Sequence, residues 1–162
     1  MDFSNLEKEA AELLSAPGAA RDRLQALCEL MRARLPRYDW FGFYVARRDE
    51  RLLELGPFAG ESTEHVLIPF GRGICGQAAE RRETFVVDDV SAAANYLACS
   101  LKVKSEIVVP VLAPGSSELL GEIDIDSHAV AAFSADDRAF LERLACLVAA
   151  DLEAIRPAPA QR

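Results

Sequence analysis

The hydrophobic positions along the chain repeat with two periods, and each period predicts a different kind of element. At both ends of the chain, apolar residues recur at every third or fourth position, which is typical of amphipathic helices. In the middle of the chain they form short runs bounded by Gly, Pro, Asp and Ser, which is typical of strands and tight turns. The expected helices are residues 3–15, 19–35 and 135–155, with a short one in 71–82, and the expected strands are residues 38–48, 52–58, 66–70, 84–90, 105–113 and 119–127.

The order of these elements predicts an α+β domain, in which an antiparallel sheet carries helices on one face. Polar "RRDE" and "PGSSE" segments separate two pairs of strands and predict hairpins. Ser134, followed three positions later by Asp137, is a capping-box signature that begins the C-terminal helix. A chain of 162 residues suits a single domain, which we expect over residues 1–155, with a loose tail at 156–162.

Alternation along the strands places acidic and aromatic side chains on particular faces of the sheet. In "LLGEIDIDS", Asp124 and Asp126 point away from the two isoleucines. In "YDWFGFYVA", Trp40 and Tyr44 share one face and the phenylalanines occupy the other, so this strand needs a cover on both faces. In "SEIVVPV", Glu106 belongs to a half-apolar row, where a charge without a partner is costly.

These three rows would form a cup with aromatic walls and several carboxylates if they met on one side of the sheet. Such a cup suits a small ligand with an ammonium group, through ion pairing and cation–π contact. Crowded carboxylates also raise one another's pKa values, so that one of them could hold a proton at neutral pH and act as a general acid. The alternative is that the rows never converge and that the acidic residues face solvent.

The four cysteines divide into two pairs. Cys28 and Cys146 lie on or beside the apolar stripes of predicted helices, so we expect both to pack in the core. Cys99 lies outside any predicted strand, in a polar context, where two lysines shortly after it would lower its pKa and favour the thiolate. Cys75 lies between glycines at a predicted helix start, where free N–H groups and the helix dipole also favour the thiolate. A small side chain packed in a tight turn is the alternative for Cys75.

Composition and spacing exclude several classes of partner. The formal net charge is -8, and no block of Lys and Arg offers a face to nucleic acid. The acidic N-terminus and the lack of a long apolar run argue against a secretory signal or a membrane span, so we expect a cytoplasmic protein without membrane contact. No C-x-x-C pair occurs, and the two histidines are not spaced as ligands, so no metal site is expected.

Five segments of the chain, "DWFGFY", "LELGPF", "IPFGRGICG", "LACSLKVKSEIVVPV" and "GEIDIDS", resemble the GAF-domain free methionine-R-sulfoxide reductases and occur in the same order, over Asp39 to Ser127. This resemblance implies a GAF domain, with helices on one face of the sheet and a small-ligand cup on the other. It implies an enzyme that reduces free L-methionine-(R)-sulfoxide to methionine with an external thiol reductant such as thioredoxin or glutathione, and without a cofactor. It also suggests a homodimer formed through the N-terminal helices.

Matching positions carry the family's functional residues onto this chain. The resemblance implies that Cys99 is the catalytic thiol and Cys75 a second redox cysteine, that Trp40 and Tyr44 form the aromatic wall, and that Glu106, Asp124 and Asp126 bind substrate, with Glu106 or Asp126 as the proton donor.

One departure from the family's pattern concerns the loop "GESTEHVLIP". Where the family carries a further cysteine, which resolves the oxidised catalytic thiol, this chain has Glu64 and His65. Two alternatives to the reductase therefore stay open. One is a GAF module that senses a small ligand without chemistry, and the other is a thiol switch based on a disulfide between Cys75 and Cys99.

Overall fold

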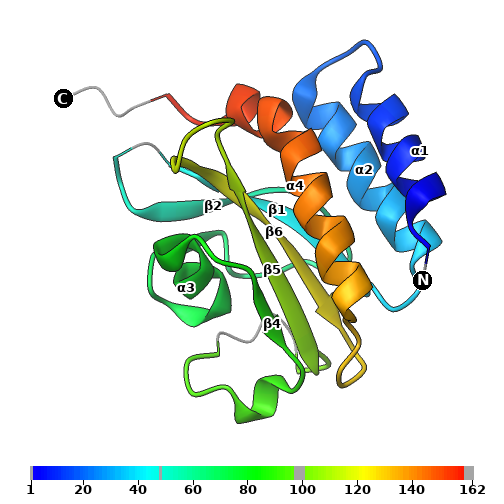
Figure 1. The fold of residues 1–162 in the computed structure, drawn as a ribbon. Coiled ribbons are helices and arrows are strands. Elements are labelled where there is room, and N and C mark those ends of the chain that lie inside the picture. The colour runs from blue at the N-terminus through cyan, green and yellow to red at the C-terminus, as the bar shows by residue number, and fades with distance from the viewer. Residues whose placement is uncertain (1, 48, 97–100, 159–162) are drawn as a thin grey trace.

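The computed structural model describes residues 2–47, 49–96 and 101–158 and has an α+β architecture, as the element order predicted (Figure 1). The helices are α1 (Ser4–Leu14), α2 (Ala20–Arg34), α3 (Gly73–Arg81) and α4 (Ala135–Ile155), with a 3₁₀ turn at Val90–Ala92, and the strands are β1 (Trp40–Ala46), β2 (Leu52–Ala59), β3 (Leu67–Pro69), β4 (Phe85–Val87), β5 (Ser105–Leu112) and β6 (Leu119–Ser127).

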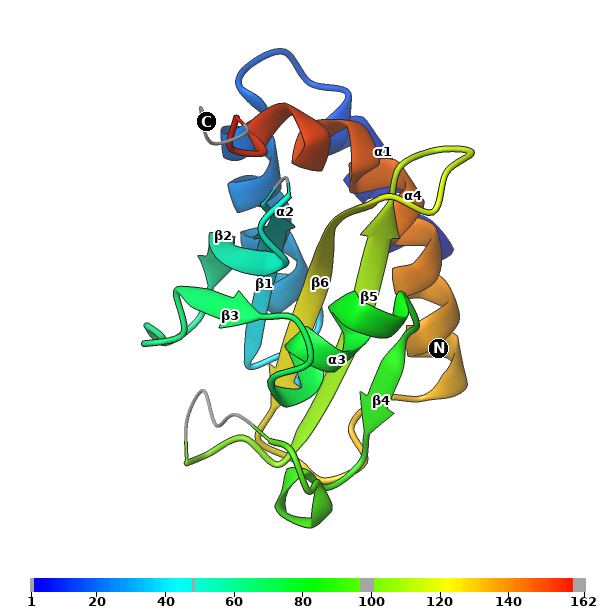
Figure 2. The ribbon, with the colours of Figure 1, turned by 90° about the vertical axis from the view of Figure 1, so that its left-hand side faces the viewer.

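The six strands form one antiparallel sheet in the order β3-β2-β1-β6-β5-β4. Helices α1, α2 and α4 cover one face of this sheet, and α3 lies over β5 and β6 on the opposite face (Figure 2). Both predicted hairpins are present, since β1 pairs with β2 and β5 pairs with β6. The sheet therefore has a thick helical layer on one side and a small covered region on the other.

Strand β1 is buried along its whole length because it separates two hydrophobic clusters. Phe41 and Phe43 pack with the helical layer in the main core. Trp40 and Tyr44 point to the other face, where they pack with Cys75 and its neighbours on α3. This arrangement explains why both faces of the β1 sequence are apolar.

Helix α4 begins at the predicted capping box, because the Ser134 side chain accepts a hydrogen bond from the Asp137 N–H and the Asp137 carboxylate accepts one from the Ser134 N–H. The prediction that Cys28 packs in the core is confirmed, but the same prediction for Cys146 is wrong, since Cys146 is exposed. It follows the buried Ala145 by one position, which is a rotation of about 100° around a helix and takes the thiol off the apolar stripe.

The C-terminal end of α4 is held to the sheet by the residue that follows it. The helix ends at Ile155, and the next residue, Arg156, still donates to the Ala46 carbonyl and pairs with Glu118 and Glu153. The last four residues of the predicted tail lie outside the described part of the chain. Among the described helices, none combines the length and the apolar character that crossing a membrane requires.

Candidate active site

The sheet register brings the three predicted rows of side chains together on the face that α3 covers. Trp40 on β1 lies opposite Asp126 on β6, and Asp126 lies opposite Glu106 on β5. Gly42, on the same face of β1, lies opposite Asp124 in the same way. Directly opposed residues of neighbouring strands point to the same face. The three rows of side chains therefore meet on one side of the sheet, as the predicted cup requires.

The acidic residues of this face are buried. The exposed fraction is 4% for Glu106, 0% for Glu122 and Asp124, and 1% for Asp126, so the alternative that they face solvent is excluded. The carboxylate oxygens of Glu122, Asp124 and Asp126 make no hydrogen bond with any residue that the structure describes. Four carboxyl groups thus share a small buried region, and three of them lack the hydrogen-bond partners that such groups normally have.

Burial on this face raises the pKa of all four carboxyl groups. Burial is the largest cause for each, because it disfavours the charged form, and the negative charge of Asp124 adds to it at Glu106, Glu122 and Asp126. Burial raises the pKa of Asp124 itself to about 7, a rise that the neighbouring Cys75 thiol and Glu106 carboxyl limit. Some of these groups therefore hold protons at neutral pH.

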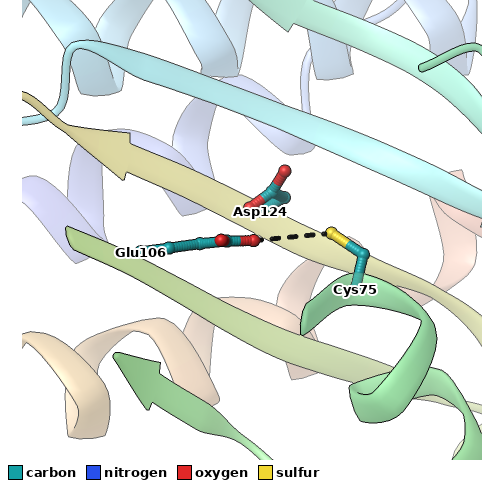
Figure 3. Close-up of side chains that lie close together, drawn as sticks. All are labelled: Cys75, Glu106 and Asp124. Carbon is teal, nitrogen blue, oxygen red and sulfur yellow. Dashed lines mark hydrogen bonds between the residues drawn. The ribbon is translucent and has the colours of Figure 1, made fainter. Parts of the chain in front are cut away.

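Cys75 lies in the first turn of α3 and points into the carboxyl groups (Figure 3). Its thiol donates toward Oε1 of Glu106 over 3.8 Å, and its sulfur also lies close to a carboxylate oxygen of Asp124. Burial, followed by the charges of Asp124, Glu122 and Glu106, raises the pKa of the thiol well above its ordinary value. The prediction that the helix start favours a Cys75 thiolate is therefore wrong, because tertiary burial outweighs the helix dipole.

The aromatic wall consists of three rings. The indole of Trp40 stacks on Phe58, with ring centres 5.4 Å apart, and lies 6.4 Å from the Tyr44 ring. The indole N–H donates to the Glu61 carbonyl over 3.0 Å, and the Tyr44 hydroxyl donates to the His65 carbonyl over 2.9 Å. These two hydrogen bonds connect the aromatic wall to the loop between β2 and β3.

A cavity of about 110 Å³ adjoins this wall at the Trp40 end of the carboxyl row. Its described lining residues are Arg32, Asp39, Trp40, Glu61, Ser62, Thr63, Val103, Asp126 and His128. Of the predicted site residues, Trp40 and Asp126 line this cavity, whereas Tyr44, Cys75, Glu106 and Asp124 lie in the adjoining buried cluster. An entering ligand would therefore meet the indole and Asp126 first.

Sequence reasoning left several residues of this region out of the candidate site. Glu122 shares the acidic face of β6, and strand alternation alone was sufficient to find it. Asp39 and His128 sit at strand ends, where the His128 N–H donates to the Asp39 carboxylate over 2.7 Å. No sequence signal marks the loop residues Glu61 and Ser62, because their position depends on how that loop folds back over Trp40.

Cys99, the predicted catalytic thiol, lies outside the described residues, so its predicted proximity to the cup stays a prediction. Lys102, one of the two lysines expected to lower the pKa of the Cys99 thiol, forms an ion pair with Glu61, with a nitrogen–oxygen distance of 2.6 Å. This ion pair joins the segment that follows Cys99 to the loop that lines the cavity.

The fold is that of a GAF domain, and residues 19–153 match the sequence profile of the GAF domain family. The chain is 38% identical over 159 residues to the free methionine-R-sulfoxide reductase of Saccharomyces cerevisiae, covering 90% of this chain and 87% of that one.

Two solved structures are similar over most of their length. The type II free methionine-R-sulfoxide reductase of Thermoplasma acidophilum is 41% identical, with a TM-score of 0.77 and coverage of 88% of this chain and 94% of that one. The Neisseria meningitidis enzyme, solved in complex with its substrate, is 32% identical, with a TM-score of 0.85 and coverage of 95% and 92%. The chain belongs to the family of free methionine-R-sulfoxide reductases.

Proposed function

We propose that this protein reduces free L-methionine-(R)-sulfoxide to methionine and that thiols are the reductant. The observation that carries the proposal is the buried row of Trp40, Asp126 and Glu106 in direct register across three strands, next to a cavity. An aromatic wall with unpaired carboxylates suits an amino acid that carries both an ammonium group and a methyl-sulfur end. The relatives named above act on such a substrate.

In the proposed complex, the Asp124 carboxylate binds the substrate's ammonium group, joined by the Asp126 carboxylate when Glu106 is the proton donor. The methyl end of the substrate lies against the Trp40 indole. The ammonium would supply a counter-charge for carboxyl groups that have no hydrogen-bond partner among the described residues. Burial strengthens such an ion pair, because water does not screen it. A peptide-bound methionine has no such ammonium group, so the same contact favours the free amino acid.

The chemical step transfers two electrons from a thiolate to the sulfoxide. The Cys99 thiolate attacks the sulfoxide sulfur while Glu106 or Asp126 gives a proton to the sulfoxide oxygen. The protonated oxygen passes from the substrate sulfur to the Cys99 sulfur as the sulfur–oxygen bond and the transient sulfur–sulfur bond break. Methionine leaves with the electron pair, and Cys99 becomes a sulfenic acid. The raised pKa values of Glu106 and Asp126 support this role, because a group that is protonated at neutral pH can act as an acid.

A second thiol completes the cycle. It attacks the sulfenic sulfur of Cys99, water leaves, and a disulfide forms. Cys75 is one candidate, and Oε1 of Glu106, 3.8 Å from its sulfur, is placed to accept the proton that the thiol must lose. An external thiol is the other candidate. In either case thioredoxin or the glutathione system restores the reduced enzyme.

Turnover of the two sulfoxide epimers tests the proposal directly. Purified protein is supplied with free methionine-R-sulfoxide or its S epimer and with dithiothreitol, and methionine is quantified. We expect turnover of the R epimer alone, loss of turnover in Cys99→Ser, and no change in Cys146→Ser, whose thiol is exposed on α4. An inactive wild type, or a fully active Cys99→Ser variant, would refute the proposal, and tight methionine binding without reduction would favour a sensor.

The two resolution routes are separated by Cys75→Ser. If Cys75 resolves the sulfenic acid, this variant completes one turnover without added thiol and then stalls until a monothiol is present. If an external thiol resolves it, the variant behaves as wild type with every reductant. A mass increase of one oxygen on Cys99 in the stalled variant would identify the intermediate.

We also propose that the protein works in the cytoplasm as a homodimer paired through α1 and α2. A reducing compartment supports this, because the cycle needs its thiols in the reduced state. Helix α1 packs against α2 and α4, whereas α2 packs on β1 and β2 and contributes Arg32 to the cavity lining (Figure 1). Pairing that is centred on α1 therefore leaves the cavity open. Light scattering of the purified protein, with a monomeric mass as the contrary result, tests the dimer.

A further inference from the structure

Three potential metal ligands from three different elements converge beneath α3 (Figure 3). The sulfur of Cys75, a carboxylate oxygen of Glu106 and a carboxylate oxygen of Asp124 all lie within 4.8 Å of one another. The sulfur–oxygen separation between Cys75 and Glu106 is 3.8 Å, close to the roughly 3.5 Å expected for two ligands of a tetrahedral zinc ion. The site therefore needs only a small adjustment to hold such an ion.

A fourth carboxyl group lies on the same face of β6 as Asp124. Glu122 is fully buried, and neither of its oxygens has a hydrogen-bond partner among the described residues. The ion pairs formed by the described Lys, Arg and His residues do not include any of the four carboxyl groups. The charge of this region must therefore be balanced by protons or by a cation that enters from outside.

The mixture of donors selects the kind of cation. Magnesium and calcium prefer oxygen ligands alone, whereas zinc accepts cysteine sulfur together with carboxylate oxygen. A cation can enter the site past Asp126, because this residue lines the cavity and lies directly opposite Glu106 in the sheet.

We propose that Cys75, Glu106 and Asp124 form a binding site for a thiophilic divalent cation of the zinc class, with Glu122 or water as the fourth ligand. The bound ion occupies the carboxylates that the substrate's ammonium would use, so zinc and the amino acid exclude each other. The binding site itself does not depend on the proposed enzymatic activity, whereas the competition rests on it.

Spectroscopic titration of the metal-free full-length protein tests the site without any need for turnover. Cadmium serves as the probe for thiolate coordination through its ultraviolet sulfur-to-metal charge-transfer band, and zinc binding is measured by calorimetry. We expect one ion per chain in the wild type, no cadmium band in Cys75→Ser, and zinc affinity lowered by more than about tenfold in Asp124→Asn. Melting curves of both variants establish that they are folded.

The other cysteines supply matched controls. Cys146→Ser should bind zinc as the wild type does, since its thiol is exposed on α4 and is not among the three donors. The proposed set of ligands also requires that Cys99→Ser keeps zinc binding. Lack of zinc binding by the wild type would overturn the proposal, and so would a cadmium band that Cys99→Ser loses and Cys75→Ser keeps.

Competition is measured in Cys99→Ser, which cannot turn over. Zinc should weaken the binding of free methionine-R-sulfoxide in proportion to its occupancy. Zinc and sulfoxide binding together would overturn the mutual exclusion. A protein that binds zinc but neither binds nor reduces the sulfoxide would refute the proposed function and leave the cation site standing.

Discussion

Trp40 on β1 lies directly opposite Asp126 on β6, and both side chains line the same cavity. The pair places an apolar ring and a buried carboxyl group at the two sides of one small opening. This relationship follows from antiparallel register, because opposed residues of neighbouring strands share a face. Both ends of an amino acid with a methyl-sulfur terminus could therefore be recognised within one cross-strand pair.

Replacing Trp40 tests the aromatic half of this pair. Trp40→Ala should raise KM for methionine-R-sulfoxide by about five- to thirtyfold, because a lost ring contact of this kind costs about 1–2 kcal/mol. Trp40→Phe is the matched control, since it keeps a ring that can stack on Phe58 but loses the hydrogen bond to the Glu61 carbonyl. Steady-state kinetics of the two variants give the comparison, and an unchanged KM in Trp40→Ala would contradict the assigned contact.

Gly42 leaves the space in which the Trp40 ring lies. A Cβ at Gly42 would come within 2.3 Å of the indole and 2.7 Å of the Phe58 Cβ, so Gly42→Ala must displace the ring. We expect a loss of about 1–3 kcal/mol in the free energy of unfolding, as for other overpacked cores, together with a raised KM. Urea denaturation and kinetics measure the two effects.

Gly18→Ala separates loss of stability from damage to the site. A Cβ at Gly18 meets nothing within 4 Å, but the backbone there has a φ of +130°, which disfavours a side chain. The control should therefore lose stability and keep its KM. If Gly42→Ala also keeps its KM, the position of the Trp40 ring does not matter for the substrate.

Strand alternation predicted the acidic face correctly because its period of two is fixed by backbone geometry. Asp124 and Asp126 had to share a face wherever the strand lay, and the β5–β6 hairpin then placed Glu106 beside them. The pairing of β1 with β6 joins segments distant in sequence. Its register could not be read from either strand, although the apolar character of both β1 faces indicated that this strand is covered on both sides.

The failed predictions concern residues whose surroundings come from other elements. For Cys75, the local features of a helix start favoured a thiolate, but the helix lies on the acidic face, where burial and then the charges of the carboxyl groups raise the pKa of the thiol. For Cys146, proximity to an apolar stripe was insufficient, because one position along a helix changes the direction of a side chain by about 100°. The cavity depends on a loop fold that periodicity does not encode.

The hydrogen bonds at the N-terminal end of α4 lead to a prediction that concerns stability and not activity. Asp137 is buried and accepts hydrogen bonds from the Ser134 and Tyr38 hydroxyls as well as from the Arg37 guanidinium. Asp137→Ala leaves these groups without their acceptor and should cost about 3 kcal/mol of unfolding free energy. The exposed neighbour Asp136 is the control, and Asp136→Ala should change stability by less than about 1 kcal/mol. Equal urea midpoints for the two variants would contradict this assignment.

The carboxyl groups beneath α3 and the Asp137 carboxyl group change the stability of the fold with pH in opposite directions. Although burial opposes ionisation, hydrogen bonds from Ser134, Tyr38 and Arg37 lower the pKa of Asp137, so its contribution is lost as the pH falls. The pKa of Asp124 is instead raised, from 3.8 to about 7. The contribution of Asp124 to the free energy of unfolding is complete below pH 3.8. It disappears as the pH rises toward 7, because this carboxyl group ionises at a lower pH in the unfolded chain than in the folded one.

Asp124→Asn should therefore flatten the pH dependence of stability on the neutral side. Between pH 4 and pH 8 the thermal midpoint of metal-free wild type should fall, and the variant should fall by several degrees less, since an amide does not titrate and about 1 kcal/mol corresponds to roughly 3 °C in a chain of this size. Both proteins keep Asp137, so its opposite effect cancels in the comparison. Scanning calorimetry at several pH values gives the two curves. If the curves of the wild type and the variant run parallel, the folded and unfolded chains release the Asp124 proton at the same pH. The Asp124 carboxyl group would then not be desolvated, contrary to its buried position.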